Sequence, residues 1–137
     1  MRTNFYSPII YLSIMLLFSC TKKEMMECPE DIACTEVFLS IFVQIKDAKN
    51  ETVKLTKTTT EIEGSDTILI KTVFTTFFDN YVIIDDLSKK DLKRDGSKVT
   101  FKGYDESNRL IVNEQYMIGH DCCHVVKLSG KEIVIIN

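Results

Sequence analysis

Short runs of alternating apolar and polar residues, separated by turn signals, constrain the fold of this chain more than any other feature of its sequence. Neighbouring residues of an extended strand point to opposite faces, so an alternation of period two is typical of a strand with one buried face. In the first run, residues 36–45, five aliphatic side chains share one face: Val37, Leu39, Ile41, Val43 and Ile45. The Asp-Ala-Lys-Asn segment at 47–50 then predicts a turn.

Further runs of the same kind follow at short intervals. They cover residues 52–62, 67–78, 81–84, 98–104, 110–118, 125–128 and 133–136. Gly119 is expected to end the strand at 110–118, because glycine inside a strand weakens it. The charged stretch 85–96 interrupts the pattern, and it predicts a solvated loop or one or two helical turns.

Seven to eight short strands with regular turns predict an all-β fold, a single small antiparallel β-sandwich. The 137 residues allow one domain, and a hydrophobic content of 45% can supply its core. The sandwich is expected to span residues 36–137. Phe74, Phe77 and Phe78 are interpreted as part of its core.

The first 19 residues do not fit this pattern. Residues 5–18 are almost wholly apolar, and Arg2 is the only charge before Lys22. An apolar run of this length is short for a transmembrane helix and is typical of a secretory signal peptide. Residues 1–19 are therefore predicted to be a signal peptide.

The residues at the end of this apolar run indicate a more specific class of protein. Leu17-Phe18-Ser19-Cys20 resembles the lipobox of bacterial lipoproteins. The resemblance implies cleavage before Cys20 and attachment of acyl chains, palmitate among them, to this cysteine. Two or three such chains hold a protein on a membrane, since each buried methylene contributes about 0.8 kcal/mol. Because Thr21 and not aspartate follows Cys20, the expected location is the outer membrane, on a face that the sequence does not assign.

Removal of the leader would leave 118 of the 137 residues, with 16 Lys+Arg against 20 Asp+Glu and a net charge of −4. This balance excludes nucleic acid as an expected partner, because the phosphate backbone requires a basic surface. Residues 20–35 are mostly polar and carry Cys28 and Cys34. They are interpreted as a lipidated tether that becomes ordered near its end.

The predicted sandwich resembles the prealbumin-like family, which includes the carboxypeptidase regulatory-like domains. The resemblance lies in the first strand with its turn at 47–50 and in the later Tyr-Val-Ile-Ile-Asp-Asp segment at 81–86. It covers residues 36–137. It implies a structural or interaction module of the cell envelope without catalytic residues.

The segment 119–124, Gly-His-Asp-Cys-Cys-His, concentrates the chemistry of the chain, with both histidines and two of the four cysteines that follow Cys20. In an oxidising envelope compartment, an even set of cysteines predicts disulfides. Four cysteines allow three pairings. Either Cys122 and Cys123 each reach one of Cys28 and Cys34, or a local Cys28–Cys34 loop accompanies a vicinal Cys122–Cys123 pair.

Two other interpretations of this segment stay open. If the segment is extended, His120, Cys122 and His124 share one face, and their nitrogen and sulfur atoms suit zinc or copper. A cysteine paired with one of the histidines could also act as a nucleophile. That role requires a third, orienting group, and Asp121 would point to the opposite face of an extended strand.

These features predict a non-enzymatic, lipid-anchored envelope protein that serves as an interaction or structural module. Its expected partners are the membrane, through the anchor, and an envelope protein or a glycan. No catalytic residue and no cofactor are assigned. The alternative is an extracytoplasmic protein that binds zinc or copper through His120, Cys122 and His124.

Overall fold

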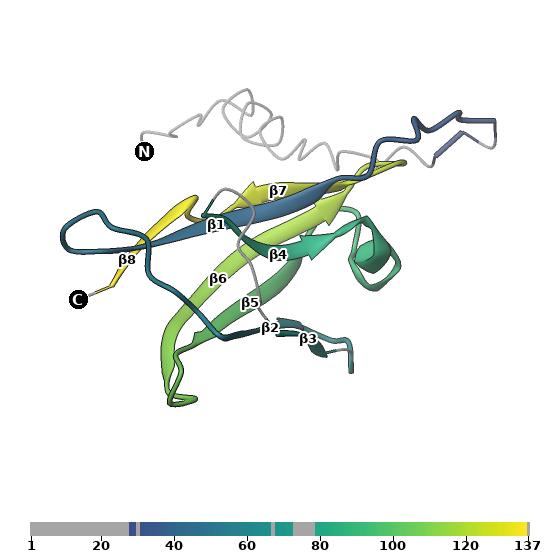
Figure 1. The fold of residues 1–137 in the computed structure, drawn as a ribbon. Helices are drawn as coiled ribbons and strands as arrows, with labels where there is room; N and C mark the ends of the chain where they lie inside the picture. The colour runs from purple at the N-terminus through teal and green to yellow at the C-terminus, as the bar shows by residue number, and fades with distance from the viewer. Residues whose placement is uncertain (1–27, 30, 67, 73–78, 137) are drawn as a thin grey trace, which may run out of the picture.

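Two β-sheets stacked on a shared apolar core make up the described part of the chain (Figure 1). The computed structural model describes residues 28–29, 31–66, 68–72 and 79–136. Eight strands and one short 3-10 helix lie within these residues, which confirms the predicted small all-β sandwich. In this described part, no helix is long and apolar enough to cross a bilayer.

The two sheets differ in size. The smaller sheet has the strand order β4 (Tyr81–Asp85), β1 (Ser40–Asp47), β8 (Ile133–Ile136). The larger sheet has the order β3 (Ile68–Thr72), β2 (Lys57–Ile62), β5 (Ser97–Tyr104), β6 (Leu110–His120), β7 (Val125–Ser129). The 3-10 helix η2 (Asp86–Asp91) follows β4 directly, inside the stretch for which the sequence predicted a loop or helical turns.

One pairing departs from the antiparallel arrangement of the other strands. β1 and β8 are parallel, with Gln44 opposite Ile133 and Asp47 opposite Ile136. The chain leaves β7 in the larger sheet and enters β8 in the smaller one, so the connection crosses between the sheets and does not fold back as a hairpin. A crossing of this kind leaves β8 free to run in the direction of β1.

The first two strands are shorter than predicted. β1 begins at Ser40 and not at residue 36, and β2 begins at Lys57 and not at residue 52. The segment between them passes from one sheet to the other, because Val53 N donates to Ile45 O in the smaller sheet and Thr56 N donates to Tyr104 O in the larger sheet, both at 2.9 Å. A segment that bonds to both sheets in turn cannot continue as a strand of either.

Gly119 does not end its strand, contrary to the prediction. β6 continues through Gly119 to His120 and pairs with β7 along this end. A Cβ atom at position 119 would lie 2.5 Å from the carbonyl oxygen of Arg94, which is closer than carbon and oxygen can approach. Glycine is therefore required here for the close approach of two backbones and not for a break in the strand.

The core lies between the facing sides of the two sheets. Its largest fully buried side chains come from both sheets: Val43, Ile45, Ile83, Ile84, Val99, Phe101 and Ile118. Along β5 and the middle of β6 the inward positions alternate with exposed or half-buried ones, as the period-two pattern predicted. The predicted signal peptide, Cys20 and the core assignment of Phe74, Phe77 and Phe78 fall outside the described residues.

The backbone contact at position 119 yields a stability prediction. Gly119→Ala should lower the free energy of unfolding by about 1–3 kcal/mol, because the added methyl group must displace the backbone at Arg94. Urea unfolding measured by far-ultraviolet circular dichroism gives this value. Gln115→Ala is the control, since Gln115 is exposed on the same strand and should change stability by no more than about 0.5 kcal/mol. Equal stabilities of the two variants would show that the close approach is wrong.

Candidate functional site at the arm and the β6–β7 turn

The chain before β1, residues 28–39 (the arm), is joined to the sandwich by two disulfides. Cys28 pairs with Cys122 and Cys34 pairs with Cys123, with Cα–Cα distances of 5.5 and 5.4 Å. All described residues of the arm are exposed. A segment that buries so little surface cannot offset its conformational entropy by packing, so the covalent bonds are what order it.

This pairing is one of those that the sequence left open. Each of the two adjacent cysteines of the β6–β7 turn takes a different partner from the arm, and no vicinal or local bond forms among these four residues. The bonded cysteines lie 94 and 89 positions apart in the sequence. The disulfides therefore connect the start of the described chain to the β6–β7 turn.

The β6–β7 turn (residues 121–124) is built around the side chain of Asp121. Its Oδ1 accepts from Cys123 N at 2.7 Å and from His124 N at 2.6 Å, while Asp121 N donates to His124 O at 3.0 Å. These backbone hydrogen bonds lower the pKa of Asp121. The segment is a tight turn, so the premise that it is an extended strand with His120, Cys122 and His124 on one face is wrong.

A second attachment of the arm runs through Asp86, the first residue of η2. Its Oδ2 accepts from Leu39 N and from His124 Nδ1, and its Oδ1 accepts from Val125 N, each at 2.8 Å. Asp86 N also donates to Leu39 O at 3.1 Å. One carboxylate thus joins the end of the arm, the start of η2 and the start of β7.

These contacts set the charge of Asp86. Its side chain is only 13% exposed, and burial by itself raises the pKa of a carboxyl group. The hydrogen bonds from Leu39, His124 and Val125 outweigh burial and hold the pKa of Asp86 below its ordinary value. The group is therefore ionised at neutral pH. The sequence interpretation of 85–96 as a solvated loop is wrong at this residue.

His124 extends this network onto the arm. A carboxylate only accepts, so Nδ1 is the donor to Asp86, and Nε2 of the ring lies 3.3 Å from Thr35 Oγ1. The order of groups, carboxylate, imidazole and hydroxyl, is that of the acid, base and nucleophile of serine hydrolases.

The surroundings of Thr35 do not complete such a site. An acyl-transfer centre also needs N–H donors aimed at the developing oxyanion. Four backbone N–H groups of this junction are already used, because those of Cys123 and His124 bond Asp121 and those of Leu39 and Val125 bond Asp86. The arrangement is that of a polar link that holds the arm.

Two basic side chains cover the other side of the turn. Lys89 Nζ donates to Cys122 O at 3.0 Å and to Cys123 O at 3.3 Å. The guanidinium of Arg94 lies 2.9 Å from Cys122 Sγ. Both come from η2 or the segment after it, so the disulfide-bearing turn contacts this region of the sandwich as well as the arm.

The predicted metal ligands are near one another in sequence, but their ligand atoms form a disulfide or hydrogen bonds. The sulfur of Cys122 is bonded to Cys28, and His124 uses both ring nitrogens on Asp86 and Thr35. His120 Nδ1 lies 2.6 Å from Asp121 O. In the part of the chain that the structure describes, no group of three or more His, Cys, Asp or Glu side chains is arranged to hold a metal ion. Cys122 and Cys123 are likewise bonded and are not free nucleophiles.

Thr35, Asp86, Lys89 and Arg94 were not assigned to this site from the sequence. Asp86 and His124 are 38 positions apart, and no motif connects them. Helix capping gave no signal for Asp86, because the N-cap of η2 is Asp85, which accepts from Leu87 N, whereas Asp86 accepts from Leu39 N and Val125 N.

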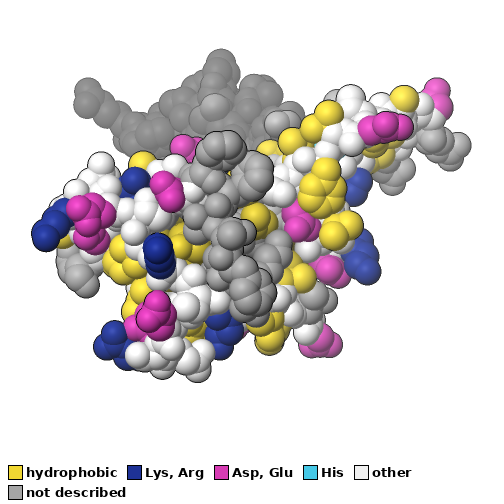
Figure 2. All heavy atoms as spheres, viewed as in Figure 1, with side chains coloured by type: hydrophobic (Ala, Val, Ile, Leu, Met, Phe, Trp, Pro, Cys, Tyr) yellow, Lys and Arg dark blue, Asp and Glu magenta, His cyan; other side chains and the backbone are white. Residues whose placement is uncertain are grey.

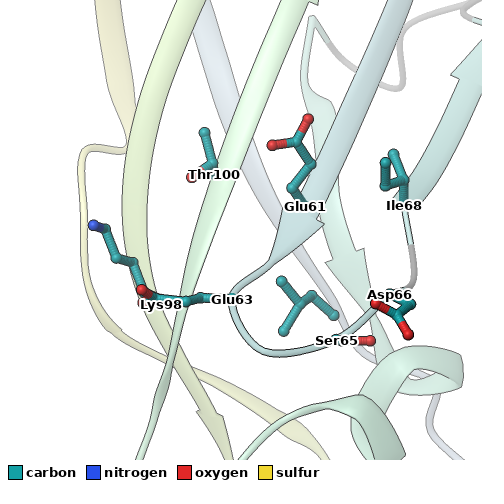
Figure 3. A pocket seen from close by; sticks show the side chains of 8 residues that line it. Glu61, Glu63, Ser65, Asp66, Ile68, Lys98 and Thr100 are labelled. Carbon is teal, nitrogen blue, oxygen red and sulfur yellow. The ribbon is translucent and has the colours of Figure 1, made fainter.

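A hollow of about 470 Å³ lies elsewhere, at the turn between β2 and β3 (Figure 3). Its labelled side chains surround an open depression: Glu61, Glu63, Ser65, Asp66, Ile68, Lys98 and Thr100. Glu61 Oε1 accepts from Lys102 Nζ at 2.6 Å, so this acid is already paired. The lining contains no histidine or cysteine, and it offers surface charge without a nucleophile and base in contact.

Comparisons of the chain with protein-family models, curated proteins and solved structures found no match.

The network at Asp86 predicts a pH-dependent effect of its removal. Asp86→Asn should lower the free energy of unfolding at neutral pH by about 1–3 kcal/mol, because backbone donors lose a charged acceptor. The pKa of Asp86 in the folded protein lies below its ordinary value of 3.8. The stability that the ionised carboxylate contributes is therefore complete above pH 3.8 and is lost as the pH falls from there through the folded pKa. The two proteins should therefore converge in stability at the most acidic pH.

Urea unfolding of both proteins at a series of pH values, with the disulfides intact, checks this effect. Asp66→Asn removes an exposed carboxylate from the β2–β3 turn and is the matched control, with an expected change of about 0.5 kcal/mol or less. A stability difference for Asp86→Asn that stays constant down to the acid-unfolding limit would contradict the role assigned to its charge.

The two disulfides should not contribute additively. When one disulfide is removed, the other still closes the long loop between the arm and the β6–β7 turn. The free energy of unfolding then falls only by the contribution of the small ring between the two disulfides, about 3 kcal/mol in the chain-entropy model. Removal of both opens the long loop and should cost roughly 7 kcal/mol in total. The variants are Cys28→Ser with Cys122→Ser, Cys34→Ser with Cys123→Ser, and all four together. Measured by urea unfolding, a loss of stability in the quadruple variant that is no larger than the summed losses of the two double variants would contradict this account.

Proposed function

We propose that this protein is a lipid-anchored module of the bacterial cell envelope, with no enzymatic activity, that holds a small β-sandwich next to a membrane. The anchor is Cys20, after removal of residues 1–19. The sandwich acts as an interaction or structural domain toward an envelope protein or a glycan. The outer membrane is the proposed location.

The observation that carries the proposal is the double attachment of the arm. Two disulfides fit an oxidising compartment outside the cytoplasm, where the proposed signal peptide would deliver the chain. The arm leads back along the chain toward Cys20, eight positions before Cys28. If this exposed segment links the domain to a membrane, its two disulfides hold the domain at a fixed place on that link.

The proposal of a non-enzymatic protein has separate support. In the described residues, the chain of Asp86, His124 and Thr35 is the arrangement closest to a catalytic one, and the N–H groups of Leu39 and Val125 beside it are engaged by Asp86. The metal-binding alternative is not carried forward, because Cys122 and His124 are engaged with Cys28, Asp86 and Thr35.

Replacement of the lipidated residue tests the proposal. Cys20→Ser should abolish acylation, so that the protein leaves the detergent phase in phase partitioning or accumulates as the uncleaved precursor. Phase partitioning, followed by intact-mass spectrometry of the protein in both phases, measures both outcomes. The control is Cys34→Ser with Cys123→Ser, which removes a disulfide and should leave acylation and cleavage unchanged. Full acylation and processing of the Cys20→Ser protein would show that Cys20 is not the anchor.

A further inference from the structure

We infer that the exposed apolar side chains at the arm form a membrane-contact surface, which docks on the bilayer that carries the anchor. This inference rests on the proposed function, since it assigns an orientation to the anchored domain. The surface consists of four arm residues and one residue of η2, with these exposed fractions: Ile32 44%, Val37 59%, Phe38 55%, Leu39 41% and Leu87 76%.

These side chains come from two segments that the structure brings together. Asp86 and Leu39 bond each other twice, through Leu39 N to Asp86 Oδ2 at 2.8 Å and through Asp86 N to Leu39 O at 3.1 Å. The next residues on each side, Phe38 and Leu87, therefore lie at the same junction. Figure 2 shows apolar side chains along the arm and where it meets the body of the molecule, at the upper right.

The length of the tether places this end of the domain near the bilayer. Eight peptide units separate Cys20 from Cys28, and a fully extended chain spans at most about 3.5 Å per residue, so the two Cα atoms are no more than about 28 Å apart. Cys28 is itself bonded to the β6–β7 turn. Because of the disulfides, the arm cannot detach from the sandwich and lengthen the tether. The contact surface therefore stays within reach of the headgroups.

The chemistry of the surface favours a zwitterionic bilayer interface as its occupant. Exposed charges of both signs stand close by in sequence, with Asp31, Glu36 and Asp95 against Lys90 and Lys93, so there is no positive excess to select anionic lipid. Exposed leucine, isoleucine and phenylalanine partition into the boundary between headgroups and acyl chains. The tether raises the local concentration of the surface to the millimolar range, so that a weak contact is sufficient.

The opposite end of β1 provides an internal reference. Ile135 is 65% exposed and pairs with Lys46, seven residues along the chain from Leu39. At about 3.3 Å per residue, this distance is about 23 Å, which exceeds the depth to which an interfacial segment inserts. A domain that docks by the arm with β1 directed away from the bilayer therefore holds Leu87 in the interface and Ile135 in water.

Single-tryptophan variants test this orientation, because the chain contains no tryptophan. Leu87→Trp and Ile135→Trp are prepared as the acylated, disulfide-bonded protein and reconstituted in phosphatidylcholine vesicles with or without brominated phosphatidylcholine. Bromine in the acyl chains should quench the fluorescence of the residue-87 variant by about half and that of the residue-135 variant hardly at all. High salt should not change either value.

Each other outcome overturns the inference in a distinguishable way. In vesicle-bound protein, equal quenching of the two variants would show that the domain does not dock by the arm end alone, and no quenching of either would show that the arm does not face the bilayer. Both results would leave the anchor intact. Shielding of the residue-87 variant from aqueous acrylamide without bromine quenching would assign the surface to a second copy of the chain. Failure of the purified protein to carry acyl chains and to float with vesicles would refute the proposed function together with the inference.

Discussion

The Asp86 carboxylate is the point at which three separate parts of the chain meet. Its two oxygens receive hydrogen bonds from the end of the arm, from the ring of His124 and from the start of β7. Because a carboxylate accepts several donors at once, one side chain can hold an otherwise exposed segment against the body of the sandwich. The disulfides then make the same connection covalent, at the turn that His124 belongs to. Hydrogen bonds fix the direction of the arm, and covalent bonds prevent its release.

The sandwich supplies the rigid support for this junction. β6 carries the disulfide-bearing turn at its end, and it is continuous through Gly119 because a glycine there allows the backbone of Arg94 to approach. Asp86 is placed by the short η2 helix, which follows the buried strand β4. The core of the sandwich and the attachment of the arm are thus mechanically connected.

Local patterning predicted most of the fold, whereas the site depended on contacts distant in sequence. The alternation in residues 98–104 and 110–118 predicted β5 and β6 because their inner faces are buried in a regular strand. The parallel pairing of β8 and the continuity at Gly119 were missed, because each depends on which backbone lies opposite. The cysteines that form disulfides were predicted from the expected oxidising compartment and from their even number. Their pairing, and the roles of Asp86 and Thr35, required the three-dimensional arrangement.

The central claim is that one continuous connection runs from an acylated Cys20 through the arm to the β6–β7 turn. Mass spectrometry of the protein isolated from envelopes without reduction, after digestion at glutamate, tests it most directly. The account predicts an acylated peptide that begins at Cys20, no free thiol, and the arm cysteines Cys28 and Cys34 linked to the peptide that contains Cys122 and Cys123. An intact leader, an unmodified Cys20, or a Cys28–Cys34 link with a vicinal Cys122–Cys123 pair would contradict it.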